Sequence, residues 1–543
     1  MKDFLKNWYP AGIFLLVAVA VMAPACGSGF VFLTDMVWGP NNGFADLFRN
    51  EIGSGTALNA LRILLSFAIP ADILQKIVLT VVLFLPGIGM YRLASRYMNR
   101  ALAVGAGLLF MLNPFVYERL LIGQWVVLLG YGFLPFAVLL FDRFLERRDW
   151  KRFLWFSFAF SVYPLLGIHY AYIAAGFLLT FGLVHLARTG EWKSLWTPIS
   201  FARILSFVVL FLLVNGFWLF PFLGSSGELS KFGLADFDAF SALPDPHFGI
   251  WFNILSLYGI WSNNFLSPKD FHPYWFLVTP VVLVFSAVGA YRLMRQGTVL
   301  AWTIALSFVP VVLIAVGYAD DLTKPLIEFL YRFVPFFSGL RDTEKAVGVL
   351  AFSYALLVPV GVAFLFESIG KRFLGGARSH RVAVAVVAVL PFLWAGTALW
   401  GAHGQIAAHP YPHGWYGAEH TLRADPDTKS VLILPWHQYI RLDFADGVMV
   451  ANPGGTFFSE PAVVGKDTGN RLLFLSETDP FDEHVARLTE APMQDEGSFW
   501  KSRGISHIVI AKTDDWEKFS GLYSSDSFDL IYDSDSISVF KIK

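Results

Sequence analysis

The stretch Phe32–Pro40, FLTDMVWGP, places one carboxylate, Asp35, just past the end of the first long apolar run. A carboxylate this close to such a run is either stranded in lipid, at a cost of about 2.5 to 3.5 kcal/mol, or placed at an interface for use. Its aromatic and aliphatic neighbours predict an apolar pocket at membrane level. Such a pocket raises the pKa of a carboxyl group unless a cation or metal compensates, which suits a general base. The alternative is that Asp35 only caps or anchors the first span.

The composition indicates a membrane protein. Of the 543 residues, 55% are hydrophobic and only 15% are charged, and the mean hydropathy is +0.54. Soluble domains carry about 25% charged residues, so we expect most of this chain to lie in a lipid bilayer. The formal net charge of -1 provides no general basic face, which argues against nucleic acid as a partner.

The N-terminal stretch Met1–Cys26 superficially resembles a lipoprotein signal. Lys2 and Lys6 precede an apolar run that ends in small residues and a cysteine. Pro24 fits the cleavage site of such a signal poorly, and many later spans already anchor the chain. We therefore interpret this stretch as an uncleaved first transmembrane helix.

About eleven apolar runs are long enough to be transmembrane helices. They cover residues 10–28, 73–92, 101–118, 122–141, 153–168, 170–187, 203–223, 273–292, 298–317, 346–366 and 382–401. The fifth and sixth runs are the least regular, because Pro164, Gly167 and His169 interrupt one continuous apolar region. These two runs are either full spans or a re-entrant feature.

The positions of Lys and Arg predict the orientation. The basic clusters are Lys2 and Lys6; Arg92, Arg96 and Arg100; Arg143, Arg147, Arg148, Lys151 and Arg152; Arg188 and Lys193; Arg292 and Arg295; and Lys371, Arg372, Arg378 and Arg381. If the spans alternate, all of these clusters fall on one side, which the positive-inside rule assigns to the cytoplasm. We expect a multi-pass plasma-membrane protein with a cytoplasmic N-terminus and an extracytoplasmic C-terminus.

The longer connections then lie on the outer side, at residues 29–72, 224–272 and 318–345. The first contains an amphipathic stretch, 56–69, whose only charge is Arg62, and this predicts a helix in the membrane interface. The inner loops are short and basic, so we expect any chemistry to face outward.

After the membrane domain at residues 1–402, the composition becomes more polar, and residues 403–543 contain no run long enough to span a membrane. Short β-type runs occur at 430–434, 447–450, 505–511, 528–532 and 536–542, and a helix-like stretch at 483–489. The last two runs flank the sequence DSD, which predicts a hairpin. We expect an extracytoplasmic α/β domain of about 140 residues.

Two pairs of charged residues are candidates for binding a phosphate. Glu118 and Arg119 lie where the third span leaves the membrane, and as neighbours they point to different faces of the helix. Arg341 and Lys345 are four residues apart, so on a helix they share one face at the outer mouth of the tenth span. Such a cationic pair suits a lipid phosphate. The alternatives are a snorkelling Arg119 and an ordinary network of ion pairs around Arg341.

Other polar residues are weaker candidates. His169 near the outer face is either a satisfied polar residue of the bundle or part of the substrate site. Asp245 and His247, in LPDPHFG, are weak candidates for metal ligands, because two such residues in a loop are a weak signal. His437 in LPWHQY is expected to have a loop role.

With these features the chain resembles the GT-C superfamily of membrane glycosyltransferases. An Asp in a long first outer loop, an interfacial helix, about a dozen spans and an exported C-terminal α/β domain carry the resemblance. The segments FLTDMVWGP, NPFVYERLLIGQW, FFSGLRDTEK and VLILPWH look most like the bacterial and archaeal branch near arabinofuranosyltransferase D. The chain departs from the superfamily in having no paired acidic motif directly at Asp35 and no WWD-type acceptor motif.

The resemblance implies an activity and its participants. Asp35 would be the catalytic carboxylate, the donor a sugar on polyprenyl phosphate, and the acceptor an extracytoplasmic glycan, glycolipid or protein. Arg341 and Lys345 would stabilise the departing lipid phosphate, and a divalent cation, Mg²⁺ or Mn²⁺, is an expected cofactor.

Two functions from other classes compete with a transferase. A transporter or flippase for lipid-linked sugars is expected to carry ionisable groups deep in several spans or broken helices at the midplane. Here the mid-span segments are almost free of charge. A membrane-anchored binding protein is the other alternative, but eleven spans are far more than anchoring requires.

Overall fold

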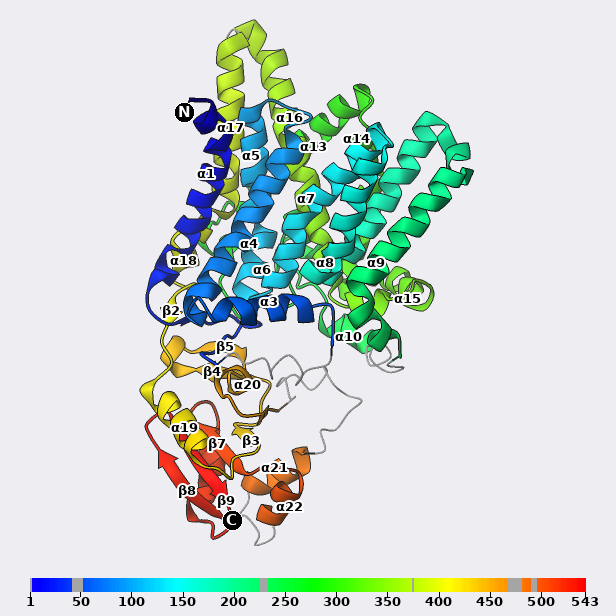
Figure 1. Cartoon of the computed structure of the whole chain (residues 1–543). Coiled ribbons are helices and arrows are strands. Elements are labelled where there is room, and N and C mark those ends of the chain that lie inside the picture. The colour runs from blue at the N-terminus through cyan, green and yellow to red at the C-terminus, as the bar shows by residue number, and fades with distance from the viewer. Residues whose placement is uncertain (1, 42–51, 225–232, 374–375, 466–480, 490–495) are drawn as a thin grey trace.

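The membrane domain is a bundle of long helices. The computed structural model describes residues 2–41, 52–224, 233–373, 376–465, 481–489 and 496–543. Within these residues ten helices are long and apolar enough to cross a membrane (Figure 1). They are α1 (Lys2–Met22), α4 (Ala71–Ala94), α5 with α6 (Arg100–Met111, Pro114–Ile122), α7 (Trp125–Glu146), α8 (Trp150–Thr189), α9 (Pro198–Gly224), α13 (Val278–Arg295), α14 (Val299–Val316), α16 (Val347–Phe373) and α17 (Gly376–Ala395). The predicted polytopic helical membrane protein is confirmed.

Helix α8 accounts for the difference between ten helices and eleven predicted spans. Its 40 residues would measure about 60 Å if straight, twice the thickness of the hydrocarbon core. Gly167 departs from helical geometry, and the two legs fold back on each other there. Phe141 of α7 contacts Phe156 in the first leg and Phe181 in the second, with ring centroids 4.9 and 5.7 Å apart. The fifth and sixth predicted spans are therefore two legs of one helical hairpin.

Basic clusters gather at the end of the bundle away from the C-terminal domain. The guanidinium of Arg96, two residues after the end of α4, lies 3.0 Å from the carboxylate of Asp142 in α7. Arg148, between α7 and α8, pairs with Glu191 just after the second leg of α8. The N-terminus lies at this end in Figure 1, and the C-terminal strands lie at the other. The arrangement is that of a multi-pass membrane protein with chemically different ends.

Short helices cover the end of the bundle that faces the C-terminal domain. The predicted interfacial helix is α3 (Thr56–Ser66), which runs across the ends of the long helices in Figure 1. The others are α10 (Leu234–Ala239), α11 (Gly249–Leu255), α12 (Pro268–Phe271), α15 (Lys324–Phe333) and α18 (Leu399–His403). Parts of the first two predicted outer segments, 42–51 and 225–232, lie outside the described residues.

The C-terminal region contains a five-stranded mixed sheet. Its strand order is β6 (Ala462–Val463), β3 (Val431–Leu434), β7 (His507–Ala511), β9 (Ile537–Ile542) and β8 (Phe528–Asp533), with β3 parallel to both of its neighbours. Its helices are α19 (His413–Ala424), α20 (Gly454–Phe457), α21 (Asp482–Thr489) and α22 (Glu496–Ser502). A separate hairpin pairs β4 (Tyr439–Leu442) with β5 (Val448–Ala451). Strands near all five predicted positions confirm the α/β class, while a domain boundary at 402/403 stays a prediction.

The first outer loop is built into the C-terminal region. Strand β1 (Phe30–Val31) pairs with β2 (Ala408–His409), and the Tyr411 hydroxyl donates to the carbonyl oxygen of Trp38 at 3.0 Å. At Gly39 any side chain would collide with the backbone of Thr456. The loop that carries Asp35 is therefore held between the bundle and the C-terminal strands.

The orientation can be tested by labelling cysteines in a Cys26→Ser background. Lys193→Cys lies on an exposed turn at the basic end, and Asp526→Cys lies in an exposed loop of the C-terminal domain. Because basic residues face the cytoplasm, a membrane-impermeant maleimide added to intact cells should label only Asp526→Cys. Both variants should react after the cells are permeabilised. Labelling of Lys193→Cys alone in intact cells would reverse the orientation.

Candidate functional site

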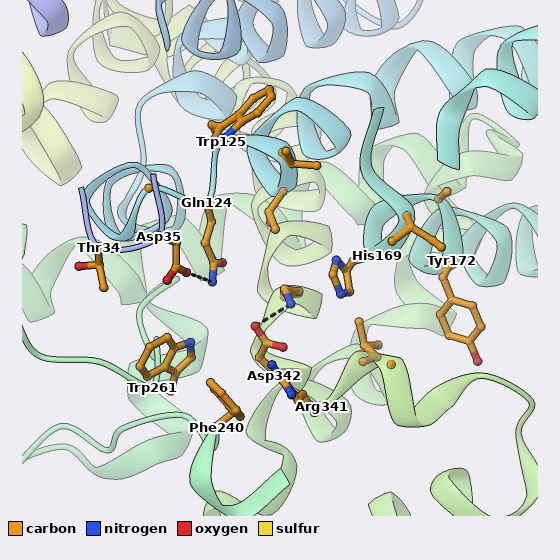
Figure 2. A pocket seen from close by; sticks show the side chains of 18 of the residues that line it. Thr34, Asp35, Gln124, Trp125, His169, Tyr172, Phe240, Trp261, Arg341 and Asp342 are labelled. Carbon is orange, nitrogen blue, oxygen red and sulfur yellow. Dashed lines mark hydrogen bonds and ion pairs between the residues drawn. The ribbon is translucent and has the colours of Figure 1, made fainter. Parts of the chain in front are cut away.

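A cavity of about 1430 Å³ opens between the helix bundle and the C-terminal domain. Helices α7, α8 and α9, the loop before α16 and the first outer loop supply its walls on the bundle side. Its charged and polar lining includes Thr34, Asp35, Gln124, His169, Arg341, Asp342, Lys345, His437, Gln438, Tyr439, Asp514 and Asp515. Figure 2 shows Asp35 and Gln124 joined by a hydrogen bond, with His169, Arg341 and Asp342 across the cavity.

The backbone around Gly123 sets the position of Asp35. Gly123 ends α6 with a φ of 84°, a left-handed conformation that favours glycine. A Cβ atom there would lie 2.7 Å from the backbone nitrogen of Met36, so a side chain would push the outer loop away. The backbone N–H of Asp35 donates to the carbonyl oxygen of Ile122 at 2.7 Å. The end of α6 and the first outer loop are thus fixed to each other.

Both oxygens of the Asp35 carboxylate accept hydrogen bonds from distant parts of the chain. The Tyr439 hydroxyl of β4 donates to Oδ1 at 2.9 Å, and Nε2 of Gln124 donates to Oδ2 at 3.3 Å. The carboxylate remains open to the cavity but has protein on most sides. This burial raises the pKa of Asp35 above its ordinary value, and the two hydrogen bonds offset part of the rise. A carboxylate in such a setting is suited to accept a proton.

A buried guanidinium fixes the orientation of Gln124. Arg119 of α6 is 1% exposed, and its Nη1 donates to Oε1 of Gln124 at 2.6 Å. Its Nη2 pairs with Oε1 of Glu344 at 3.0 Å, and Glu344 is also 1% exposed. Because Arg119 can only donate hydrogen bonds, the amide oxygen of Gln124 must face Arg119, and the amide nitrogen faces Asp35. The series Glu344, Arg119, Gln124 and Asp35 is one continuous network.

The cationic side of the cavity comes from the loop before α16. Lys345 pairs with Asp342 at 2.6 Å, and both are buried. Although burial favours protonation of Asp342, the neighbouring positive charges hold its pKa below the ordinary value. The Arg341 guanidinium carbon lies 4.4 Å from the centre of the Phe240 ring. Arg341 and Lys345 both line the cavity, although two short 3₁₀ turns, Phe337–Leu340 and Thr343–Ala346, replace the expected α-helix around them.

The remaining wall of the cavity is apolar. Helices α8 and α9 contribute Phe160, Pro164, Ile168, Phe211, Trp218, Leu219, Phe222 and Leu223. Phe222 meets Phe336 of the loop after α15, with ring centroids 6.3 Å apart. His169 lies beside the turn of the α8 hairpin, so it stands between this apolar wall and the cationic side. The cavity therefore offers an apolar groove that leads to charged groups.

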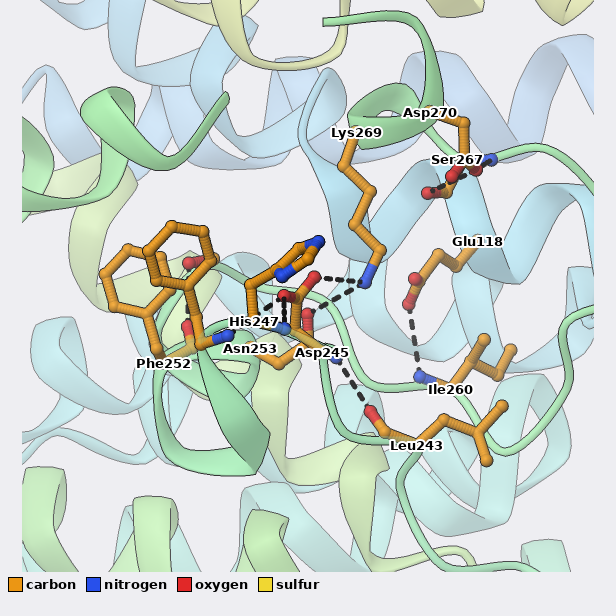
Figure 3. Close-up of polar contacts among 12 residues, drawn as sticks. Glu118, Leu243, Asp245, His247, Phe252, Asn253, Ile260, Ser267, Lys269 and Asp270 are labelled. Carbon is orange, nitrogen blue, oxygen red and sulfur yellow. Dashed lines mark hydrogen bonds and ion pairs between the residues drawn. The ribbon is translucent and has the colours of Figure 1, made fainter. Parts of the chain in front are cut away.

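Two predicted site residues have other roles in the structure. Neither Glu118 nor Arg119 is among the described residues that line the cavity, and their role in binding a phosphate stays a prediction. Glu118 has a different partner from Arg119, as expected for neighbours that point to different faces of a helix: its Oε2 accepts from the backbone N–H of Ile260 at 3.3 Å (Figure 3). Arg119 contacts Gln124, which in turn donates a hydrogen bond to Asp35.

Both carboxylate oxygens of the metal candidate Asp245 have protein partners. The Oδ1 atom of Asp245 accepts from the backbone N–H groups of His247 and Phe248, and Oδ2 accepts from Lys269 at 3.2 Å (Figure 3). These oxygens are arranged for N–H donors and an ammonium group. No group of three or more His, Cys, Asp or Glu side chains suited to a metal occurs among the described residues. The expected Mg²⁺ or Mn²⁺ ion stays a prediction.

Sequence reasoning missed much of the polar lining, including Gln124, Asp342 and Tyr439 around the proposed base and Asp514 and Asp515 in the C-terminal domain. Gln124 and Asp342 lie inside the segments NPFVYERLLIGQW and FFSGLRDTEK, which already carried candidate residues. A polar residue directly after a glycine at the end of an apolar run was the available signal for Gln124. Tyr439 lies 404 residues after Asp35, and nothing in a single sequence joins two residues so far apart.

Known proteins match this chain in architecture and not in sequence. No protein-family model and no curated protein sequence matches the chain. Among solved structures it is similar to the arabinofuranosyltransferase AftD from Mycobacteria, with a TM-score of 0.61 and 13% identity over 100% of this chain and 40% of AftD. The chain has the GT-C fold.

A second match agrees with this fold. ArnT from Cupriavidus metallidurans in the apo state has a TM-score of 0.50 and 13% identity over 100% of this chain and 98% of ArnT. The chain spans about two fifths of the length of AftD. At identities this low, similarity establishes the fold, and activity must be argued from the site.

The buried pair of Arg119 and Glu344 gives a test of the network. Arg119→Met leaves an uncompensated buried carboxylate, so it should lower the free energy of unfolding by about 3 to 5 kcal/mol. The double variant Arg119→Met, Glu344→Met should recover much of this loss, because apolar replacement of a whole buried pair is often neutral. Equilibrium unfolding with SDS in detergent micelles measures both.

The exposed pair of Arg332 and Glu328 provides the matched control. Arg332→Met should change the free energy of unfolding by at most about 1 kcal/mol, as surface pairs do. If Arg119→Met cost no more than this control, the buried network would not hold the site.

Proposed function

We propose that this protein is a membrane glycosyltransferase that moves a sugar from a polyprenyl-phosphate donor to an extracytoplasmic acceptor. The observation that carries the proposal is the position of Asp35, an oriented carboxylate in a cavity that joins an apolar groove to cationic side chains. The GT-C fold and the glycosyltransferase name of AftD support the reaction class. By the positive-inside rule, the cavity faces the outer side of the plasma membrane.

The shape and charge of the cavity suit a lipid-linked donor. An acyl chain fits the apolar wall of α8 and α9, because aliphatic and aromatic side chains line it. The phosphate then lies near Arg341 and Lys345, whose positive charges favour an anion. Lys345 is partly neutralised by Asp342, so Arg341 is the stronger candidate. His169 borders the groove and the charged groups.

The chemistry is a displacement at the anomeric carbon. Asp35 accepts the proton of an acceptor hydroxyl while that oxygen forms a bond to the anomeric carbon. The bond from this carbon to the phosphate oxygen breaks, and its electron pair leaves with the polyprenyl phosphate. Arg341 and Lys345 stabilise the charge that develops on that phosphate. A direct displacement inverts the anomeric configuration, and Gln124 and Tyr439 keep Asp35 in place throughout.

A transporter or flippase for lipid-linked sugars would not need this arrangement. Its function requires a path across the membrane, whereas the charged lining of this cavity lies at the end of the bundle that faces the C-terminal domain. The transferase therefore explains more of the site.

Asp35→Asn tests the proposed base. The substitution keeps the shape of the side chain and removes the proton acceptor, so glycosyl transfer should fall by about 10² to 10⁴. Folding and donor binding should be retained. Transfer is measured with radiolabelled polyprenyl-phosphate sugars in proteoliposomes, and binding is measured by titration of a short-chain polyprenyl phosphate.

Arg341→Ala provides the contrasting variant. It should weaken polyprenyl-phosphate binding by about 1.5 to 3 kcal/mol, the range for a hydrogen bond to a charged group. Arg332→Ala, which removes an exposed arginine outside the cavity, should leave donor affinity unchanged. Near wild-type transfer by Asp35→Asn would show that Asp35 is only an anchor.

A further inference from the structure

The proposed reaction leaves one wall of the cavity for the acceptor. In an inverting displacement, the incoming oxygen and the leaving group lie on opposite faces of the anomeric carbon. The donor uses the apolar groove and the cationic side. The wall that remains belongs to the C-terminal domain, and we call it the C-terminal wall. Its residues are His437, Gln438, Tyr439, Met449, Asp514 and Asp515.

Hydrogen bonds fix the position of the C-terminal wall relative to the proposed base, Asp35. The backbone N–H of Ala451, at the end of the β4–β5 hairpin, donates to the carbonyl oxygen of Thr34 at 2.8 Å. The backbone N–H of Asn452 donates to the carbonyl oxygen of Gln438 at 2.7 Å, and its side-chain amide donates to that of His437 at 3.2 Å. A group bound to this wall would therefore be presented to Asp35 without rearrangement.

Two carboxylates dominate the wall and are themselves fixed. Asp514 accepts the backbone N–H of Arg441 through Oδ2 at 2.6 Å, and its side chain is exposed. Asp515 lies 3.1 Å from Nε2 of His437 through Oδ1 and 2.7 Å from Lys518 through Oδ2. Although burial acts in the opposite direction, these hydrogen bonds hold the pKa of Asp515 below its ordinary value. Both side chains keep lone pairs for further donors.

The charge of the wall limits which acceptors can bind. None of the described residues of the C-terminal wall is Lys or Arg. An acceptor with a phosphate or carboxylate near the reacting hydroxyl would face Asp35, Asp514 and Asp515, and like charges placed together cost several kcal/mol. A group rich in neutral hydroxyls donates hydrogen bonds to the same carboxylates.

The cavity also offers an aromatic ring on which an acceptor sugar can stack. Trp261 lines the cavity on the side of Asp35, where its ring packs against Phe240 with centroids 5.1 Å apart (Figure 2). The apolar face of a sugar ring packs against an indole, while its hydroxyls reach polar groups around it. A peptide offers fewer donors to a wall made mainly of hydrogen-bond acceptors.

We propose that the C-terminal wall is the acceptor subsite and that it selects a neutral, hydroxyl-rich carbohydrate over phosphorylated glycans and peptides. The proposal rests on the proposed glycosyl transfer. Asp514 and Asp515 are its specificity-determining residues, Trp261 supplies a stacking surface, and the acceptor hydroxyl is directed at Asp35.

Binding can be measured without the transfer reaction, in the full-length protein in nanodiscs. The probes are neutral tetrasaccharides of glucose, mannose, galactose and arabinose, the same sugars carrying one phosphate, and a serine- and threonine-containing peptide. Saturation-transfer difference NMR is the readout. At least one neutral tetrasaccharide should bind at least tenfold more tightly than its phosphorylated form and than the peptide.

The double variant Asp514→Asn, Asp515→Asn removes both charges and keeps one acceptor oxygen at each position, which preserves the hydrogen bond from the Arg441 N–H and one of the two hydrogen bonds made by the side chain at 515. Asn also tolerates the left-handed backbone of Asp514, whose φ is 50°. This variant should bind the neutral tetrasaccharide about tenfold more weakly and lose most of the discrimination against its phosphorylated form. Polyprenyl-phosphate affinity should not change. The matched control is Asp526→Asn, Asp535→Asn, which alters two exposed residues of the same domain outside the cavity.

The outcomes separate this inference from the proposed function. Tighter binding of the phosphorylated sugar or the peptide, unchanged discrimination in the double variant, or no binding of any neutral tetrasaccharide would overturn the acceptor assignment. None of these results bears on Asp35→Asn, whose loss of transfer is measured separately. Conversely, the Asp35→Asn protein could transfer sugar at the full rate while the carbohydrate selectivity is as expected. This result would support the acceptor subsite and contradict Asp35 as the general base.

Discussion

The buried guanidinium of Arg119 is the interaction on which the rest of the site depends. It donates hydrogen bonds to the carboxylate of Glu344, directly before α16, and to the amide oxygen of Gln124. A buried arginine must satisfy its donors within the protein, because leaving a charge unpaired there costs several kcal/mol. Meeting this requirement turns the amide nitrogen of Gln124 toward Asp35. A structural constraint in the bundle thereby orients a carboxylate in the cavity.

The C-terminal domain contributes a second hydrogen bond to Asp35 from the other side of the cavity. Tyr439 donates to Asp35, and the β4–β5 hairpin is hydrogen-bonded to the loop that carries it. Because the cavity has walls from both the bundle and this domain, neither part alone forms the site. The division also separates the substrates: an apolar groove and Arg341 suit a lipid phosphate, whereas Asp514 and Asp515 suit neutral hydroxyls. In our two proposals the bundle therefore holds the donor, and the C-terminal domain selects the acceptor.

The sequence predicted the fold well because lipid imposes strong rules on it. Long apolar runs, one-sided basic clusters and the α/β pattern after Trp400 all have counterparts in the structure. The hairpin within α8 appeared as two spans interrupted at Gly167, which was the correct physical signal. Asp35, His169, Arg341 and Lys345 were predicted as site residues and do line one cavity. Glu118 and Arg119 have partners inside the protein that the sequence did not indicate, because a charged residue at a helix end looks the same whether it faces a ligand or a buried partner. Tyr439 was out of reach, since its role depends on how two distant segments pack.

The pH–rate profile of the Tyr439→Phe protein tests most directly whether Asp35 is the base. Asp35 works in its unprotonated form, so transfer should rise with pH through its pKa, which burial places above the ordinary value. The Tyr439 hydrogen bond lowers that pKa. Removing the hydroxyl while keeping the ring should therefore move the acidic limb of kcat/KM to higher pH, with little loss of rate on the alkaline side of the limb. An acidic limb that is identical in wild type and Tyr439→Phe would contradict Asp35 as the proton acceptor.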